Sequence, residues 1–201
     1  MKSEVFNCCN MELMAKYPDN HFELAIVDPP YGIGMSGTLG KASKKTKGFS
    51  FKAKEYKKKD WDNVTPPQEY FDELKRVSKN QIIWGANYFT DKLPIIKNYV
   101  FWYKKGQSND SKFNEGEKRL HPTQKPVRLY EWLLANYAKE GDKILDTHGG
   151  SMSSVIACLN LGFEITCTEL DKDYYEQAKF RINEHQKQQS LFMEQQEIKF
   201  N

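Results

Sequence analysis

The chain has 201 residues, of which 39% are hydrophobic and 28% charged, with a net charge of +3; these values are typical of one folded domain with a sizeable core. No apolar run approaches the roughly 20 residues of a membrane span, and the first residues lack the apolar stretch of a signal peptide. None of the four cysteines lies in a Cys-x-x-Cys pair, so we expect reduced thiols, no metal site and a cytoplasmic location.

Short apolar runs alternate with helical patterns along the chain, which favours an α/β fold with a mostly parallel sheet. The expected strands are residues 4–9, 22–27, 81–86, 98–103, 142–148 and 163–171. Helices are expected over residues 11–17, over 65–79 with a capping box at Thr65 and Gln68, from Pro126 to Tyr137, over 151–161, and along a last segment that presents Tyr175, Ala178 and Ile182. Residues 1–188 then form one domain, and the Gln-rich tail from Gln186 is expected to be disordered or to dock weakly.

A lysine-rich insertion over residues 35–60 interrupts this pattern, with nine lysines against two acids between Lys41 and Asp60. Such a charge run is commonly a solvated loop. With three aromatic residues among the lysines, it can also be a basic arm for a phosphate backbone. The candidate DNA-binding residues are Lys44, Lys45, Lys47, Lys57, Lys58 and Lys59.

Two short apolar strands end in aspartate, at Asp28 and at Asp146. In an open α/β sheet, ligands bind beyond the carboxyl ends of the strands, where the strand order reverses. Asp146 is followed by a Gly149–Gly150 turn, whose backbone can approach a ligand near a helix N-terminus. Glu169 ends the next expected strand, where an acid can accept hydrogen bonds from both ribose hydroxyls. The turn alone also fits a structural role, but the turn and the acid together indicate a cofactor that carries a nucleoside.

The residues DPPY at positions 28–31 resemble the catalytic motif of the amino-group DNA methyltransferases. The stretch HPTQKPVRLYEWLL, which begins at His121, is similar to the cofactor-site segment of their permuted beta class, in which the catalytic motif comes first, as here. The ordered pieces DPPYG, EYFDEL, IIWGANYF, HPTQKP and GDKILDTHGGS are similar to small phage or mobile-element adenine-N6 methyltransferases. The resemblance implies the Rossmann-like S-adenosylmethionine-dependent methyltransferase fold, with a mixed, mostly parallel sheet and helices on both faces.

The resemblance also implies an activity, which is methyl transfer from S-adenosylmethionine, without a metal, to adenine N6 in double-stranded DNA on a flipped base. Asp28 and the main-chain carbonyl of Pro29 accept the amine N–H bonds, Pro30 helps to hold that carbonyl rigid, and Tyr31 offers a ring for stacking. Glu169 binds the ribose, and Thr123 and Lys125 contact the carboxylate end of the cofactor. The implied cofactor-binding residues are Asp146, His148, Gly149, Gly150, Ser151, Glu169, His121, Thr123 and Lys125.

The same resemblance places the protein in a bacterial or phage-infected host, is compatible with a homodimer, and leaves a cognate restriction endonuclease and the target sequence open. Within this chemistry, cytosine-C5 methylation is excluded because no cysteine follows a proline. Cytosine-N4 enzymes tend to carry Ser at the position of Asp28, which favours adenine N6. An RNA or protein amine is a further alternative.

Three features depart from the family pattern. Met152 stands where relatives have glycine, so its side chain can crowd the methionine moiety or shift the loop. Cys9 stands where relatives have an aspartate that reads the cofactor's adenine. The target-recognition segment is shortened to residues 106–120. These departures leave open the alternative that the chain is a catalytically impaired methyltransferase fold that acts as a DNA-binding module.

Overall fold

The computed structural model describes residues 3–34, 59–102, 120, 121 and 123–198. Most of the predicted basic insertion, with Lys44, Lys45, Lys47, Lys57 and Lys58, lies outside the described residues, as does most of the segment 106–120. None of the helices in the described ranges is long and apolar enough to cross a membrane.

The centre of the molecule is a five-stranded sheet with the order β1-β5-β4-β2-β3. Every pair of neighbours is parallel, which fits the α/β class inferred from the sequence. From β2 the chain proceeds to β3 on one side, and from β4 it proceeds to β5 on the other. The strand order therefore reverses between β2 and β4, which is where such a sheet binds ligands. The strands are β1 (Glu4–Phe6), β2 (Phe22–Val27), β3 (Ser78–Ile83), β4 (Lys143–Asp146) and β5 (Glu164–Thr168).

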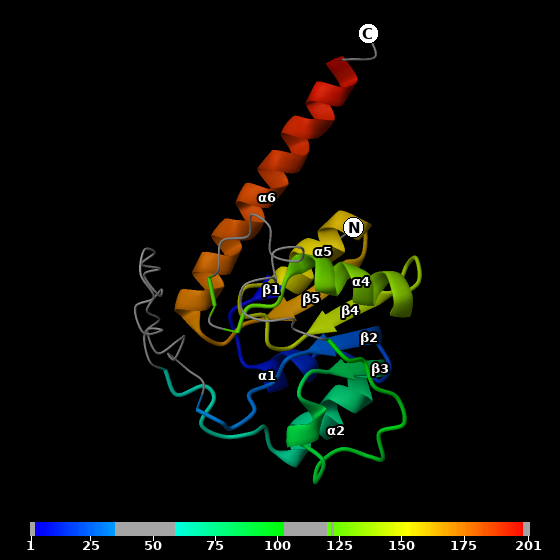
Figure 1. Ribbon diagram of the computed structural model, residues 1–201, viewed down its shortest axis with the longest axis vertical. Helices are drawn as coiled ribbons and strands as arrows, with labels where there is room; N and C mark the ends of the chain where they lie inside the picture. The colour runs from blue at the N-terminus through cyan, green and yellow to red at the C-terminus, as the bar shows by residue number, and fades with distance from the viewer. Residues whose placement is uncertain (1–2, 35–58, 103–119, 122, 199–201) are drawn as a thin grey trace, which may run out of the picture.

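Helices cover both faces of this sheet (Figure 1). Leu24 and Ile26 of β2 pack into a core cluster with α4 (Val127–Tyr137), α5 (Ser153–Leu161) and α6 (Lys172–Ile198). Ala25 and Val27 face the opposite cluster, which contains residues of α1 (Asn10–Met14) and α2 (Gln68–Val77). Because β2 is buried on both faces, its sequence reads as a continuous apolar run, as is usual in a parallel sheet.

Both predicted ends of the helix over residues 65–79 were wrong, and each has a local cause. The helix predicted from Thr65 begins at Gln68, because the Thr65 hydroxyl accepts a hydrogen bond from Lys92 Nζ at 2.6 Å and caps nothing. Its predicted end at residue 79 was also too late, because β3 begins at Ser78 and pairs in register with Phe22 of β2.

Residues 98–102 of the strand predicted over 98–103 are not in a strand. Tyr99 and Phe101 are 65% and 89% exposed and stack on one another. An apolar run alone therefore does not make a strand here, since a strand also needs a neighbour for its backbone hydrogen bonds.

The tail from Gln186, expected to be disordered or to dock weakly, is helical in its described part. It continues α6 through Ile198, and Figure 1 shows this helix projecting beyond the sheet. A short 3-10 turn, η1 (Ala86–Tyr88), follows β3.

Candidate active site

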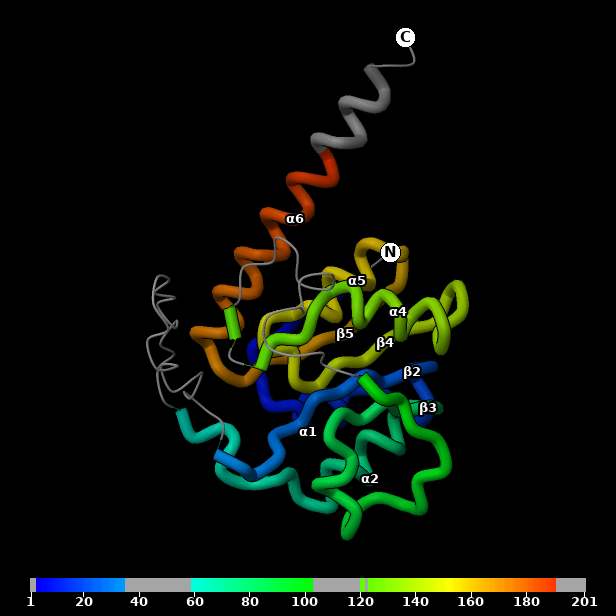
Figure 2. Tube along the Cα trace, in the orientation of Figure 1, coloured from blue at the N-terminus to red at the C-terminus, as the bar shows by residue number. Residues whose placement is uncertain are grey.

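Three carboxylates follow three neighbouring strands at the same edge of the sheet. Asp28 follows β2, Asp146 ends β4 and Glu169 follows β5, and these strands are adjacent and parallel. Figure 2 shows the three strands side by side, with the chain leaving them at one edge. The structure thus brings together the acids that the sequence pattern indicated.

Asp28 is held by donors on both of its oxygens. The Tyr31 hydroxyl donates to Oδ1 at 2.5 Å, and Lys125 Nζ forms an ion pair with Oδ2. Burial together with the Asp28 charge raises the pKa of Tyr31 well above its usual range, so its hydroxyl stays protonated. Pro29 is buried and Pro30 is half-buried, so the motif begins inside the protein and leads outward.

Asp62 holds the loop that carries Tyr31. This carboxylate is 2% exposed and accepts hydrogen bonds from the backbone N–H groups of Tyr31 and Gly32 at 2.7 and 3.0 Å. Its main-chain oxygen accepts a third hydrogen bond, from the N–H of Gly34 at 2.9 Å. Sequence reasoning gave Asp62 no role in the site, although it lies in a short WDN triplet.

The ring of Tyr31 is positioned by the turn after β3. It stacks on Tyr88, with centroids 4.9 Å apart and planes at 7°. Gly85 lies against the same ring, since an added Cβ would lie 2.3 Å from Tyr31 Cε1. Gly85 also has a φ of +66°, a conformation that favours glycine. Sequence reasoning gave neither residue a role in the site, and a glycine two residues after the end of β3 was the available signal.

The glycine turn and Glu169 form a second unit at the end of β4 and β5. The Gly150 N–H donates to Glu169 Oε2 at 2.7 Å, and the Asp171 N–H donates to Oε1 at 2.8 Å. Gly149 donates its N–H to the carbonyl of Thr168 at 2.9 Å. Burial raises the pKa of Glu169 despite these backbone hydrogen bonds.

Asp146 points inward and organises the start of α5. Its carboxylate accepts hydrogen bonds from Ser154 Oγ at 2.5 Å and from the His148 N–H at 3.0 Å. Burial raises the pKa of Asp146 to about 6, against the effect of these donors. The His148 ring shares hydrogen bonds with Asn10 Nδ2 and Thr147 Oγ1 at 3.2 and 2.9 Å, and burial lowers its pKa to about 4. The imidazole is therefore neutral near pH 7.

The remaining predicted cofactor residues differ in position. His121 lies next to the turn, because a Cβ on Gly150 would be 3.7 Å from its ring, and burial lowers its pKa to about 4. Thr123 is exposed and hydrogen-bonds His121 Nδ1. Ser151 is buried, shares a hydrogen bond with Ser153 Oγ and gives its carbonyl to Arg181. Lys125 contacts Asp28, on the other side of β4 from Glu169.

Lys59 is the one predicted DNA-binding lysine among the described residues. Its ammonium lies 2.5 Å from Asp171 Oδ2 and 3.1 Å from Asp173 Oδ2, above the ring of Tyr174. Two carboxylates already neutralise this charge, so a DNA phosphate would have to compete with them.

Comparison with known proteins agrees with this geometry. A family model described as DNA methylase, for N6 and N4 enzymes, matches residues 52–180. The chain belongs to the DNA methylase family.

Curated relatives are similar over shorter stretches. The type II methyltransferase M.HpaI of Haemophilus parainfluenzae is 36% identical over 66 residues, which are 33% of this chain and 21% of that protein. M2.MboI of Moraxella bovis is 27% identical over 133 residues, 62% of this chain and 48% of that one. The chain thus spans less than half the length of these curated relatives.

Solved structures share the fold. The M1.HpyAVI–SAM complex aligns with a TM-score of 0.52 at 16% identity, covering 90% of this chain and 100% of the other. The cytosine-N4-specific PvuII DNA methyltransferase aligns with a TM-score of 0.51 at 12% identity, covering 90% and 86%. Together with the sheet order, these likenesses establish the α/β methyltransferase fold.

The structure accounts for the methionine at the position where the family pattern has glycine. Met152 adopts a left-handed conformation with φ 54° and precedes α5, but its side chain is fully buried in the core cluster with α4 and α5. Its Cγ would lie 3.1 Å from a Cβ on Gly149. The side chain therefore packs beneath the glycine turn, inside the protein.

We expect Met152→Gly to destabilise the protein. Relief of the left-handed conformation is worth ~1–2 kcal/mol, whereas the loss of a fully buried Met side chain costs about 2–5 kcal/mol. The free energy of unfolding should therefore fall by ~1–3 kcal/mol in a urea titration. Met152→Ala loses the buried side chain but keeps the left-handed strain, so its free energy of unfolding should fall further. A Gly variant that is no more stable than the Ala variant would contradict this explanation.

Cys9 lies directly before α1, with its Sγ 3.8 Å from Asn10 Oδ1. Asn10 in turn contacts His148. Directly before α1, Cys9 thus provides only a thiol, and the adjacent side-chain oxygen and nitrogen are those of the Asn10 amide.

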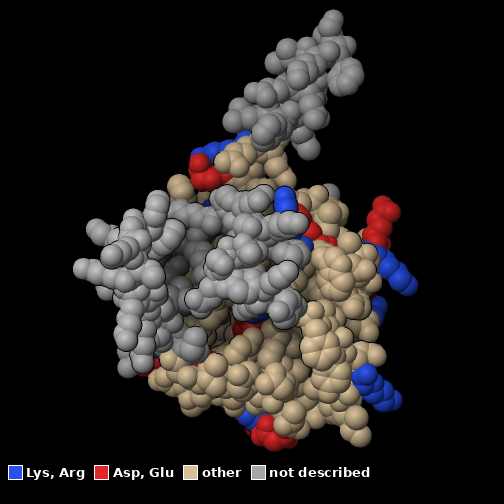
Figure 3. Space-filling model, viewed as in Figure 1, with Lys and Arg blue, Asp and Glu red and all other residues tan. Residues whose placement is uncertain are grey.

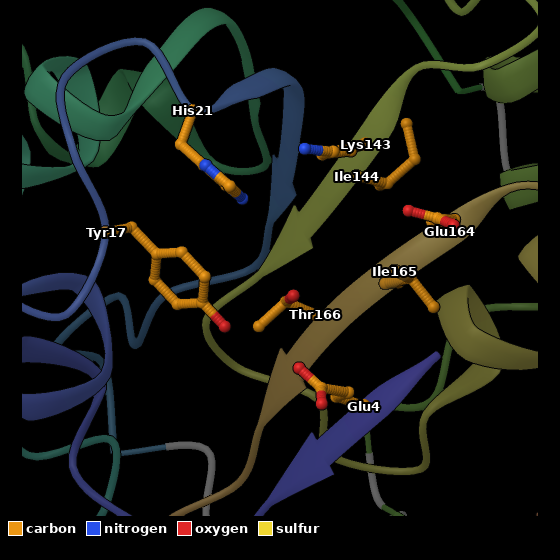
Figure 4. A pocket seen from close by; sticks show the side chains of 8 residues that line it. All are labelled: Glu4, Tyr17, His21, Lys143, Ile144, Glu164, Ile165 and Thr166. Atoms are coloured by element: carbon orange, nitrogen blue, oxygen red, sulfur yellow. The ribbon is translucent and has the colours of Figure 1, made fainter. Parts of the chain in front are cut away.

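A cavity of about 160 Å³ lies elsewhere and contains none of the predicted site residues. Figure 4 shows Tyr17 and His21 on one side of it and the strand residues Lys143, Glu164, Thr166 and Glu4 across from them. Lys143 and Glu164 begin β4 and β5, so this cavity lies toward the amino ends of the strands. No group of three or more His, Cys, Asp or Glu side chains suited to a metal occurs within the described ranges.

Proposed function

We propose that the chain transfers a methyl group from S-adenosylmethionine to the exocyclic amine of a base in DNA, with adenine N6 as the acceptor. Family membership supports this, and one observation carries it: Asp28 and Glu169 follow β2 and β5, on either side of β4 at one edge of the sheet. Two strand spacings place these strand ends about 10 Å apart, a span that one cofactor and one target amine can share.

The cofactor side fits a nucleoside. Each Glu169 oxygen accepts one backbone N–H, and a carboxylate oxygen has a second acceptor position. The carboxylate can therefore also accept two ribose hydroxyls. Gly150, with φ +52°, presents backbone without a side chain beside this acid. S-adenosylmethionine, when bound, supplies an electrophilic methyl group.

On the amine side, the Asp28 carboxylate and the Pro29 carbonyl accept hydrogen bonds from the two N–H groups of the target amine. Hydrogen bonding in this geometry directs the nitrogen lone pair toward the methyl carbon. The N–C bond forms as the C–S bond breaks, with its electron pair on sulfur, and the nitrogen then releases one proton to water. Proline nitrogens offer no competing N–H, and Tyr31 provides a ring for the flipped base.

Nucleoside analysis tests the proposal. Unmethylated DNA is incubated with labelled S-adenosylmethionine and digested, and the labelled nucleosides are separated by chromatography. We expect N6-methyladenine, because Asp28 is the acid that adenine enzymes carry at this position. N4-methylcytosine would keep the mechanism and change the base. No labelled nucleoside would contradict the proposal, and RNA and protein pools serve as parallel substrates.

Contact with the DNA backbone is proposed for the basic insertion. On the face shown in Figure 3, the described surface is mostly uncharged and its basic side chains lie apart. A phosphate-binding surface on this face therefore requires lysines outside the described residues. Replacing Lys57 and Lys58 by alanine should weaken DNA binding similarly for all sequences. It should also reduce the slope of log K against log salt by ~0.9 for each phosphate that is no longer neutralised by a lysine. Lys79→Ala/Lys97→Ala is the charge-matched control, and an unchanged slope in the Lys57/Lys58 variant would refute the assignment.

A further inference from the structure

Lys125 lies in the site at a place that a cofactor-binding role does not explain. It is 9% exposed, and its Nζ forms an ion pair with Oδ2 of Asp28. The ring of Trp84, which directly follows β3, lies 5.1 Å from the same ammonium. The lysine expected at the carboxylate end of the cofactor therefore contacts the carboxylate on the amine side.

This contact restricts the orientation of Asp28. The terminal torsion of an aspartate is broad and has no sharp rotamer preference. Here one donor, Tyr31 Oη, lies on Oδ1 and another, Lys125 Nζ, lies on Oδ2, so rotation of the carboxylate would break both contacts. Each oxygen still has a further acceptor position for an N–H.

The environment favours retention of this pair. Asp28 is 19% exposed at its side chain, and leaving one charge of a largely buried pair without its partner is costly. The indole face of Trp84 attracts the ammonium from a second direction. Pro126, the residue after Lys125, precedes the first residue of α4, so the lysine backbone is fixed by the start of a helix.

We propose that Lys125 is a positioning residue for methyl transfer, which holds the Asp28 carboxylate in the orientation that accepts the target amine. This inference rests on the proposed function and deepens it. It assigns Lys125 to the chemical step, whereas a lysine at the cofactor carboxylate would act on cofactor affinity.

The test separates these two roles in Lys125→Met, which keeps the length of the aliphatic stem and removes the charge. We expect kcat to fall about 30- to 100-fold, the effect of a small misplacement of a reacting group, while the Kd for S-adenosylmethionine in calorimetry stays within threefold. Lys125→Arg, which keeps a cation for Asp28, should recover part of kcat. Lys79→Met, an exposed lysine that pairs with Glu23, is the control and should leave kcat unchanged.

Two results would overturn the proposal. One is a cofactor Kd that rises tenfold or more with kcat at saturating cofactor unchanged; the other is a kcat that does not respond to Lys125→Met. A wild type that transfers no methyl group would overturn the proposed function, and the role of Lys125 in it as well. A thermal double-mutant cycle of Asp28→Asn and Lys125→Met then shows separately whether the pair exists, because coupled residues give a melting-temperature shift smaller than the sum of the single shifts.

Discussion

Asp28→Asn is expected to reduce methyl transfer by about 10²- to 10³-fold, the usual effect of removing one preorganised group that stabilises developing charge. The asparagine keeps the shape of the side chain, so the Tyr31 hydroxyl retains an oxygen to donate to. It lacks the negative charge that stabilises the developing positive charge on the amine. The amide also presents an NH2 group where one of the amine N–H bonds should be accepted. Single-turnover transfer at saturating cofactor measures the effect.

The control separates catalysis from folding. Asp72→Asn changes an exposed carboxylate on α2 that accepts a hydrogen bond from Gln68, and it should leave the rate unchanged. Cofactor affinity should persist in Asp28→Asn, because Glu169 and the glycine turn are on the other side of β4. A rate within threefold of the wild type would show that Asp28 does not hold the amine.

Gly85→Ala is also expected to reduce methyl transfer strongly, because it disturbs Tyr31 directly. An added Cβ would lie 2.3 Å from Cε1 and 2.7 Å from Cζ of that ring, so the ring or the turn has to move. Tyr31 is tied to Asp28 through its hydroxyl at 2.5 Å, so a displaced ring also releases one support of the carboxylate. We expect a loss of transfer of about tenfold to 100-fold, as for a misplacement of about 1 Å.

Gly141→Ala is a matched control for the backbone conformation. Gly141 has φ +86°, but a Cβ there has no atom within 4 Å. Both variants incur the left-handed penalty of ~1–2 kcal/mol, and only Gly85→Ala adds an overpacking cost of about 1–3 kcal/mol. Urea titrations of the two variants measure this difference. Equal stability and equal activity would contradict the contact between Gly85 and Tyr31.

The parts of the fold that sequence reasoning predicted are those set by local pattern. The run FELAIV forms β2 over Phe22–Val27, because residues buried on both faces leave a continuous apolar signal. The acids Asp28, Asp146 and Glu169 could be assigned to one edge, because parallel strands end on the same side. The Gly149–Gly150 turn and Glu169 are adjacent in space because they too follow neighbouring parallel strands.

The contacts that complete the site join segments distant in sequence, and a single sequence does not show them. Asp62 contacts Tyr31 across 31 positions, and the Asp28–Lys125 pair spans nearly half the chain. Residues 98–102 have an apolar pattern but do not form a strand. Whether a segment finds a neighbouring strand to pair with depends on the rest of the sheet and not on the segment's own sequence. The length of α6 was missed because its polar end carries little hydrophobic periodicity.

The central claim is that Asp28 after β2 binds the target amine while Glu169 after β5 binds the cofactor in the same site. Its most direct test is a calorimetric titration with S-adenosylmethionine. Wild type, Asp28→Asn and Glu169→Ala are titrated under the same conditions. We expect one site with similar Kd in the wild type and Asp28→Asn, and a Kd at least tenfold higher in Glu169→Ala. Absence of binding by the wild type, or equal Kd values in all three proteins, would contradict the claim.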